Sequence, residues 1–551
     1  MGGLDGNVVS DAAQGSVSST GDTAEAPPRF APGPDRRGNC ISNRAAQFCS
    51  WKPGKGALPL SRSPVLPLAP DRTESSRATE RLLSGQRSHV RLPGLDRTGP
   101  VAGRGWRGGN FLGTPQYVSL RNGDPAGAQP SSIPIHPDLF SHAVVDMATL
   151  DPGDEGFSTQ CVWSGDPASS PDGAAVPPIY HTVTFEYDDL DTWQAVGAGE
   201  EPGHIYSRNT NPTVEAFEKK MRVLEGAEAA TSFATGMAAV SNTLLSLLSP
   251  GDRAVSITDT YGGTNKIFND TLPRFDVEVV LCETDDPEAI ERAIDEGCEV
   301  LYLESPTNPT LKIVDLRRLA RAAEDVGATV IVDNTFATPV NQRPLALGAD
   351  LVLHSATKFL GGHSDVMGGV VCGPEDLIET IFQFREIHGA SLAPKSAALL
   401  TRGLKTLALR VERHNENARR VADVLDSHPA VEQVFYPGRP DHRFHDVARR
   451  QMDGFGGILS FTLRGGFGSV RRLLENLQRA HRAASLGSVH TLVGPPATTS
   501  HVELSPEERA AAGIPESLVR YSTGIENAPD LIADLRRGLE RVEAHLEGAG
   551  T

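Results

Sequence analysis

The chain has 551 residues and a net charge of −18 at neutral pH. An acidic excess of this size argues against general binding to nucleic acids or anionic membranes, and no apolar run approaches the about 20 residues that span a bilayer. Six cysteines are spread along the sequence without a Cys-x-x-Cys pair, which indicates reduced thiols in a cytoplasmic protein rather than disulfides or a zinc site.

The first 146 residues differ in composition from the rest. They hold 16 Lys and Arg against 12 Asp and Glu, are rich in Pro, Gly and Ser, and show no sustained periodicity. Such a segment cannot bury enough apolar surface to offset the entropy of ordering. We therefore predict a disordered extension over 1–146, without a signal peptide, whose arginines are solvated. Ordered structure is expected to begin near Met147, and we hypothesise that this methionine is the native start, which the intact mass of the native protein would test.

Seven short runs rich in Val, Ile and Leu follow, and segments with helical spacing, such as 315–327, separate them. Continuous apolar strands that alternate with helices are typical of a mostly parallel sheet that is buried on both faces. We therefore predict an α/β fold. The expected strands are 229–234, 253–258, 277–282, 300–305, 329–334, 351–356 and 368–373.

After residue 400 this alternation weakens, which predicts a smaller α+β C-terminal domain. One long helical stretch covers 403–428, and a closing helix covers 530–546. Strands are expected at 431–437 and 456–465. The glycine-rich "GGFG" that follows is expected to be a simple turn rather than the start of a helix that binds phosphate.

Polar residues lie where two of the apolar strands end, and ligands of parallel sheets bind at this edge. Asp333 ends the strand at 329–334, and Lys358 follows the strand at 351–356. Taken alone, the two residues favour a buried ion pair, or a solvated loop lysine.

Two turns change that interpretation. Thr235 and Gly236 lie between a strand and a helix, where free N–H groups can hold a phosphate. Tyr261 follows another strand, where its ring can stack on a flat ring. A phosphate site, a stacking aromatic, a carboxylate and a lysine together describe pyridoxal 5′-phosphate (PLP). The lysine binds this cofactor covalently, and the carboxylate keeps its ring nitrogen protonated.

Two longer blocks, "YLESPTNPTLKIVDL" (302–316) and "VIVDNTFATPVNQRPLALGADLVLHSATKFLGGHSDVMGG" (330–369), closely resemble the transsulfuration family of PLP enzymes. This family includes cystathionine γ-synthase, cystathionine γ-lyase, methionine γ-lyase and O-acetylhomoserine sulfhydrylase, and the resemblance covers roughly residues 155–545. It implies the aminotransferase-like fold of fold-type I PLP enzymes. The implied division is an arm over 147–205, a PLP-binding large domain over 206–400 and a small domain over 401–551.

The resemblance also implies which residues contact the cofactor. Lys358 matches the lysine that binds PLP, Asp333 the carboxylate at the ring nitrogen, and Tyr261 the stacked aromatic. Further contacts are implied for two hydroxyls on the phosphate side, two backbone donors to the phosphate, and an asparagine near the phenolic oxygen, namely Ser355 and Thr357, Gly236 and Met237, and Asn308. Tyr206 and Arg208 match residues that reach the phosphate of a neighbouring subunit, so active sites are expected to form in dimers that assemble as a homotetramer.

The substrate contacts are implied in the same way. Arg520 matches the arginine that binds the substrate α-carboxylate, and its planar fork suits that task because it donates two parallel hydrogen bonds. Ser485 is expected to assist Arg520, with Asn308 nearby. The expected partner is therefore a small amino acid, without a metal ion, nucleic acid or membrane.

The activity that the resemblance implies is chemistry at the γ-carbon of an L-amino acid. Lys358 would move protons at Cα and Cβ, and Tyr261 would help the γ-substituent to leave. We predict γ-elimination of the cystathionine γ-lyase type. The alternatives are γ-replacement, as in cystathionine γ-synthase or O-acylhomoserine sulfhydrylase, methionine γ-lyase activity, and a PLP-binding regulator without turnover.

Three features bear on the choice among these activities. Methionine γ-lyases often have a cysteine where this chain has Gly263, which counts against that activity. His490 stands where relatives that act on cystathionine tend to have glutamate, and "GPPATTSH" (494–501) departs from the family pattern. Because these positions flank the distal substrate pocket, the substrate of this protein could carry a γ-substituent other than cysteine.

Overall fold

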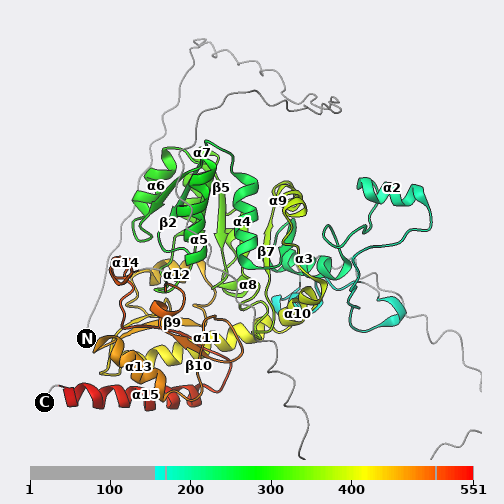
Figure 1. Ribbon diagram of the computed structural model, residues 1–551. Coiled ribbons are helices and arrows are strands. Elements are labelled where there is room, and N and C mark those ends of the chain that lie inside the picture. The colour runs from blue at the N-terminus through cyan, green and yellow to red at the C-terminus, as the bar shows by residue number, and fades with distance from the viewer. Residues whose placement is uncertain (1–154, 168–169, 503–504, 550–551) are drawn as a thin grey trace, which may run out of the picture. The chain divides into compact units, whose positions relative to one another are not determined.

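A computed structural model of the protein describes residues 155–167, 170–502 and 505–549. The predicted extension over 1–146 and the proposed start at Met147 lie outside these residues. Two β-sheets and their helices organise the described chain (Figure 1).

The larger sheet has seven strands in the order β1-β7-β6-β5-β4-β2-β3. These strands are β1 (Ala229–Phe233), β2 (Arg253–Ile257), β3 (Glu278–Cys282), β4 (Val300–Glu304), β5 (Thr329–Asp333), β6 (Leu351–His354) and β7 (Gly369–Gly373). Strands β2 to β6 pair in parallel with their neighbours among themselves, whereas β7 runs antiparallel to both β1 and β6. The prediction of a mostly parallel sheet is confirmed, with the strands in the expected places.

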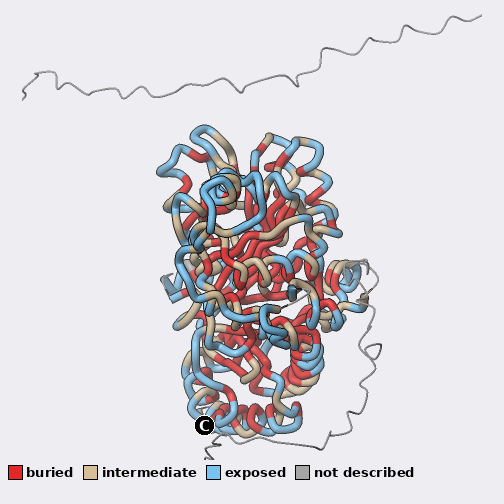
Figure 2. The backbone as a smooth tube through the Cα atoms, turned by 90° about the vertical axis from the view of Figure 1, so that its right-hand side faces the viewer, coloured by how far each residue is buried: buried red, intermediate tan, exposed pale blue. Residues whose placement is uncertain are grey.

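Alternate residues of the central strands enter two different apolar layers. In β4, Leu301 and Leu303 pack with helices α6 (Pro287–Asp295) and α7 (Leu316–Val326). Tyr302 lies between them and packs on the opposite face with α4 (Gly236–Leu247) and α9 (Glu375–His388). This alternation follows from the two-residue period of a strand. Helices therefore cover both faces, and the strands are buried between them (Figure 2).

Local signals set the ends of the helices. In α7, the Asp315 side chain accepts a hydrogen bond from the N–H of Arg318 at 3.3 Å, and the helix ends at Gly327 with φ 75°. The helix predicted over 315–327 is thus confirmed. The other helices before residue 405 are α1 (Phe157–Trp163), α2 (Leu190–Ala198), α3 (Pro212–Glu225), α5 (Gly262–Lys266), α8 (Thr338–Asn341) and α10 (Pro394–Leu404).

A second, five-stranded sheet forms the smaller C-terminal domain, in the order β10-β11-β12-β9-β8. Its strands are β8 (Val431–Phe435), β9 (Ile458–Leu463), β10 (His481–Arg482), β11 (Leu492–Gly494) and β12 (Leu518–Ser522). All pairs are antiparallel except β10 with β11. The accompanying helices are α11 (Leu407–Asp426), α12 (His445–Gln451), α13 (Gly466–Asn476), α14 (Pro506–Ala511) and α15 (Ala528–Ala549).

Two sequence-based expectations about this domain are wrong. The helix expected over 403–428 is two helices, because α10 ends at Leu404 and α11 begins at Leu407. The glycine-rich turn does open a helix: Gly465 has φ 83°, and α13 begins at the next residue. A left-handed glycine turns the chain directly from β9 into α13 there.

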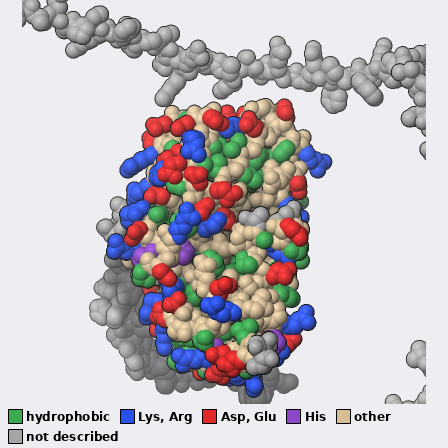
Figure 3. Space-filling view, turned by 90° about the vertical axis from the view of Figure 1, so that its left-hand side faces the viewer, with side chains coloured by type: hydrophobic (Ala, Val, Ile, Leu, Met, Phe, Trp, Pro, Cys, Tyr) green, Lys and Arg blue, Asp and Glu red, His purple; other side chains and the backbone are tan. Residues whose placement is uncertain are grey.

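The described surface mixes charges of both signs. On the face shown in Figure 3, acidic and basic side chains are interspersed rather than gathered by sign. None of the helices in the described ranges is long and apolar enough to cross a membrane. Four cysteines lie in these ranges, and all four are buried, free thiols.

Candidate active site

Three neighbouring strands of the large sheet end in ionisable side chains. Glu304, Asp333 and His354 are the last residues of β4, β5 and β6, and Glu304 lies opposite Asp333 in register. Because parallel strands end at one edge of a sheet, these side chains gather there. Lys358 follows His354 in the next turn of chain. The structure thus brings the predicted Asp333 and Lys358 to the same edge.

Asp333 is a buried carboxylate that is only 9% exposed. Its Oδ1 accepts a hydrogen bond from the N–H of Thr335 at 3.0 Å, but burial still raises the pKa of the carboxyl. His354 is the basic group that acts on this carboxyl, and its Nε2 is paired with Glu225 at 2.5 Å. A cation beside Asp333 would offset its burial, and a protonated ring nitrogen is such a cation.

Lys358 carries an amine that is suited to act as a base. Its Nζ donates a hydrogen bond to Ser485 Oγ at 3.2 Å. Burial, and secondarily the positive charge of Arg520, lower the pKa of Lys358 to about 8. A substantial fraction of the amine is therefore neutral near pH 7.5, and only the neutral amine can accept a proton or attack an aldehyde.

This low pKa predicts how Lys358 reacts in the cofactor-free protein. We expect its acetylation by a small anhydride to reach half of its maximum near pH 8, because the amine loses its proton as the pH rises through its pKa. Competitive labelling at a series of pH values, followed by peptide mass spectrometry, measures this. Lys395, which is exposed on α10, is the reference. A midpoint near about 10.4, the value for a lysine in water, would contradict the expected environment.

The first turn of α4 forms a cradle for an anion. Thr235 Oγ1 caps the helix by accepting the N–H of Ala238 at 3.0 Å. The N–H groups of Gly236 and Met237 are in the first turn, where a helix leaves its donors without internal partners. A Cβ at Gly236 would lie only 2.7 Å from the Cβ and Oγ of Ser355. The glycine therefore lets the loops that follow β1 and β6 approach each other.

The two hydroxyls expected on the phosphate side have different surroundings. Ser355 lies against Gly236, and its backbone N–H donates to Thr335 Oγ1 at 2.8 Å. The Thr357 hydroxyl is engaged with Gly368: it donates to the carbonyl oxygen at 3.2 Å and accepts from the N–H at 3.1 Å. This exchange closes the loop that follows Lys358 onto the start of β7.

Tyr261 presents its ring at the same edge. It precedes α5, and the residue is 45% exposed, so part of its surface is accessible to a ligand. The backbone of Tyr261 is held by Glu304 at the end of β4, because the Tyr261 N–H donates to Glu304 Oε2 at 2.7 Å.

Arg520 reaches this edge from the second sheet. The side chain extends from β12 and is only 8% exposed. One nitrogen donates to Asn308 Oδ1 and the other to the carbonyl oxygen of Ser485, both at 2.9 Å. Burial lowers the pKa of Arg520 to about 10, so the group stays charged at neutral pH. The loop of Asn308 is also held by the second sheet, where Ser460 Oγ donates to the carbonyl oxygen of Pro309 at 2.7 Å.

Ser485 joins the base to the carboxylate-binding group. Its hydroxyl accepts from Lys358 while its carbonyl accepts from Arg520. Its φ of 128° is unusual for a residue with a side chain and costs of order 1–3 kcal/mol. This strained backbone directs the hydroxyl and the carbonyl of one residue to two different functional groups.

Tyr206 and Arg208 are not brought to these residues within the chain. Both are exposed, and the Arg208 guanidinium lies 5.6 Å from the centre of the Tyr206 ring. Arg208 donates to the carbonyl oxygen of Glu386 at the end of α9. Their expected contact with a neighbouring subunit stays a prediction.

Sequence reasoning missed Glu304 and the Glu225–His354 pair. Glu304 ends an apolar strand just as Asp333 does, so the same criterion would have found it. The pair joins residues 129 positions apart, and both side chains are almost fully buried. No local sequence pattern predicts such a contact, because α3 and β6 come together only in the folded chain.

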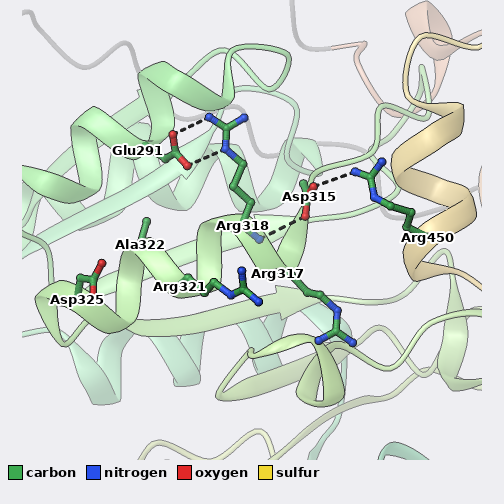
Figure 4. A pocket seen from close by; sticks show the side chains of 8 residues that line it. All are labelled: Glu291, Asp315, Arg317, Arg318, Arg321, Ala322, Asp325 and Arg450. Atoms are coloured by element: carbon green, nitrogen blue, oxygen red, sulfur yellow. Dashed lines mark hydrogen bonds and ion pairs between the residues drawn. The ribbon is translucent and has the colours of Figure 1, made fainter. Parts of the chain in front are cut away.

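A surface hollow of about 500 Å³ lies along α7, and none of the predicted site residues lines it (Figure 4). Four of the charged residues that line it form two ion pairs within the protein. Arg318 pairs with Glu291 at 2.7 Å, and Arg450 pairs with Asp315 at 3.1 Å. Within the described ranges, no group of three or more His, Cys, Asp or Glu is arranged to hold a metal ion. The strand-end cluster is therefore the candidate active site.

The residues of this cluster fit PLP. A buried carboxylate in need of a cation, an amine with a lowered pKa, a helix start with room for a phosphate and an accessible aromatic residue are the four features that the cofactor requires.

Comparisons with known proteins agree with this fit. The L-methionine γ-lyase of Fusobacterium nucleatum subsp. nucleatum is 44% identical over 373 residues, which cover 67% of this chain and 94% of that protein. The cystathionine γ-lyase of Bacillus subtilis (strain 168) is 42% identical over 371 residues, covering 67% and 95%. The solved cystathionine γ-synthase of Xanthomonas oryzae pv. oryzae in complex with cystathionine has 39% identity and a TM-score of 0.68, and the match covers 71% and 99%. The profile of the Cys/Met metabolism PLP-dependent enzyme family matches residues 158–540, and the chain belongs to this family.

Proposed function

We propose that the protein catalyses γ-elimination on a γ-substituted L-amino acid, in which one water molecule is consumed and the protonated substituent, 2-oxobutanoate and ammonia are released. The observation that carries this proposal is the shared contact at Ser485. Lys358 Nζ and the Arg520 guanidinium bond to the same residue, at 3.2 and 2.9 Å. A proton-transfer group and a carboxylate-binding group are thereby held together, as chemistry at the α-carbon of an amino acid requires.

Each residue has a distinct task in this proposal. When bound, PLP supplies an electron sink for the negative charge at the substrate Cα. Asp333 would hold the ring nitrogen, and Gly236, Met237 and Ser355 would hold the phosphate. Further contacts are proposed for Thr357 on the phosphate side and for Asn308 near the phenolic oxygen.

The substrate is handled by three side chains. Arg520 binds and orients the α-carboxylate with its two donors. The neutral Lys358 amine removes the Cα proton and later a Cβ proton. Tyr261, which is partly accessible, donates a proton to the departing γ-substituent.

The identity of the γ-substituent depends on the space beside Tyr261. A Cβ at Gly263 would lie 2.8 Å from both Tyr261 Cε1 and Met237 Sδ. The Tyr261 ring therefore occupies the space that a larger residue at 263 would need, so this pocket differs from one with a cysteine there. The 44% identity to a methionine γ-lyase nevertheless places methionine among the substrates to test.

γ-Replacement is the second candidate activity, because a cystathionine γ-synthase is among the solved relatives. An assay with cystathionine, methionine, homocysteine and O-acylhomoserines, each with and without cysteine, separates the two. We expect 2-oxobutanoate and ammonia from at least one substrate without added cysteine. A thioether product that forms only when cysteine is present would favour replacement, and no product from any substrate would refute both.

The cradle at α4 gives a direct test of cofactor binding. Gly236→Ala is expected to weaken PLP binding by about tenfold, because the added methyl meets Ser355 at 2.7 Å and overpacking costs about 1–3 kcal/mol. The dissociation constant, measured by visible absorbance, tests this. Gly468→Ala in α13 is the matched control, since a Cβ there meets nothing within 4 Å. Equal affinities in the two variants would refute a cradle at Gly236.

We also propose that active sites are completed in a dimer within a homotetramer of the cytoplasm. The exposed Tyr206 and Arg208 support this assembly, and the four buried free thiols support the location. Several large apolar side chains of the N-terminal part are likewise exposed, namely Trp163, Val176, Ile179, Val183, Leu190 and Trp193. Analytical ultracentrifugation of the holoenzyme tests the assembly, and a monomer with full PLP affinity would refute it.

A further inference from the structure

Glu304 carries a second buried carboxyl group, next to that of Asp333 in the candidate active site. It ends β4 directly opposite Asp333 of β5. Residues in register on parallel strands point to the same face of the sheet, and both side chains are buried, with 4% and 9% exposed. Two carboxyl groups therefore lie side by side where a single cation, the ring nitrogen, is expected.

The same carboxyl supports residues on the ligand side of the site. Glu304 Oε2 accepts the N–H of Tyr261 at 2.7 Å, and the backbone N–H of Asn308 also stabilises the carboxylate. Tyr261 stands at a turn before the five-residue α5, and the residue is 45% exposed. Because nearly half of this residue is free of packing, the position of its ring depends in part on how the Tyr261 backbone is held.

The charges around Glu304 oppose a second negative charge. Burial, and then the neighbouring Asp333, raise the pKa of Glu304 well above its ordinary value, and Asp259 adds to this despite its ion pair with Lys312. On the far side of Asp333, His354 is paired with Glu225 and is not shared with Glu304. A protonated Glu304 retains one oxygen to accept from Tyr261 and gains an O–H donor.

We propose that Glu304 is a positioning residue: as a neutral carboxyl it holds the Tyr261 backbone and leaves Asp333 as the one charged partner of the ring nitrogen. This inference rests on the proposed roles of Asp333 and Tyr261. In this proposal Glu304 controls the position of the Tyr261 ring and the net charge of the site, although it does not itself touch the substrate.

The test compares Glu304→Ala and Glu304→Gln in the full-length holoenzyme, with Glu283→Ala as the control. Glu283 is exposed and follows β3 at the same edge of the sheet. The PLP dissociation constant and the visible circular dichroism of the bound cofactor are measured, together with the melting temperature. Glu304→Ala is expected to weaken PLP binding by about tenfold, because the Tyr261 N–H loses its acceptor, and to change the dichroism. Glu304→Gln should restore the dichroism and bring affinity within about threefold of wild type, since an amide is neutral and keeps an acceptor.

The outcomes are decisive in either direction. If Glu304→Ala matches Glu283→Ala in affinity and dichroism, Glu304 does not position the ring. If Glu304→Gln binds PLP as weakly as Glu304→Ala, the carboxyl acts as a charged group and the neutral state is wrong. Should the alanine variant fail to fold, the glutamine variant against wild type decides by the same limits. None of these readouts needs an amino-acid substrate, so a missing γ-elimination activity would refute the proposed function without affecting this result.

Discussion

Lys358→Ala is expected to lower kcat for 2-oxobutanoate release by at least about 10³-fold. Proton transfer by a positioned side chain contributes about 10²–10⁴-fold, and this variant also removes the covalent attachment of the cofactor. The structure supports the magnitude, because Lys358 has a lowered pKa of about 8 and Nζ lies 3.2 Å from Ser485 Oγ. An alanine there has no group that can carry a proton between Cα and Cβ.

Steady-state kinetics and the visible spectrum measure the two losses separately. The variant should lack the borohydride-sensitive absorbance of covalently bound PLP. Lys395→Ala is the control, because this lysine is exposed on α10 and should leave both quantities unchanged. A Lys358→Ala enzyme that turns over at the wild-type rate would show that the base is another residue.

Arg520→Ala is expected to raise KM for the amino acid by about 100-fold, with PLP still bound. Removing one partner of a buried, hydrogen-bonded charge pair costs about 2–5 kcal/mol. Here the guanidinium is 8% exposed and already oriented by Asn308 and Ser485, so its donors need no rearrangement when the carboxylate arrives. Kinetics over a range of substrate concentrations, and PLP content per chain, test the two parts of this expectation.

Arg520→Lys distinguishes charge from geometry. A lysine keeps the positive charge but lacks the planar fork, so we expect only a small part of the lost affinity to return. If Arg520→Ala instead released PLP while substrate affinity stayed unchanged, Arg520 would be a cofactor ligand and its proposed role would be wrong.

Much of the large sheet was predictable because its signal is local. Runs such as Val300–Glu304 and Thr329–Asp333 contain at least three consecutive apolar residues, as is typical of a strand buried on both faces. The direction of β7 was not predictable, because Gly369–Gly373 is a short, fully buried run like the parallel strands of the same sheet. The break between α10 and α11 was missed, although Thr406 is the N-cap of α11 and threonine is a residue type that favours this position.

The site shows the same division between local and distant information. Asp333 and Lys358 could be found because each follows a recognisable strand, and Glu304 could have been found in that way. The contact between Arg520 and Asn308 joins residues 212 positions apart. Only the resemblance to a family suggested it, because no spacing within one segment encodes how two sheets meet.

Arg520 lies on β12 of the second sheet and Lys358 follows β6 of the large sheet, yet in the proposed function both would engage the end that every α-amino acid has in common. In the proposed function neither residue would contact the γ-substituent, which would face the region of Gly263 and the segment 494–501. Substitutions in that region can therefore change which substrate side chain the site binds. The groups that bind the amino and carboxylate ends of the substrate would stay in place. This separation accounts for how chains about 40% identical to this one bear the names of lyases, synthases and sulfhydrylases.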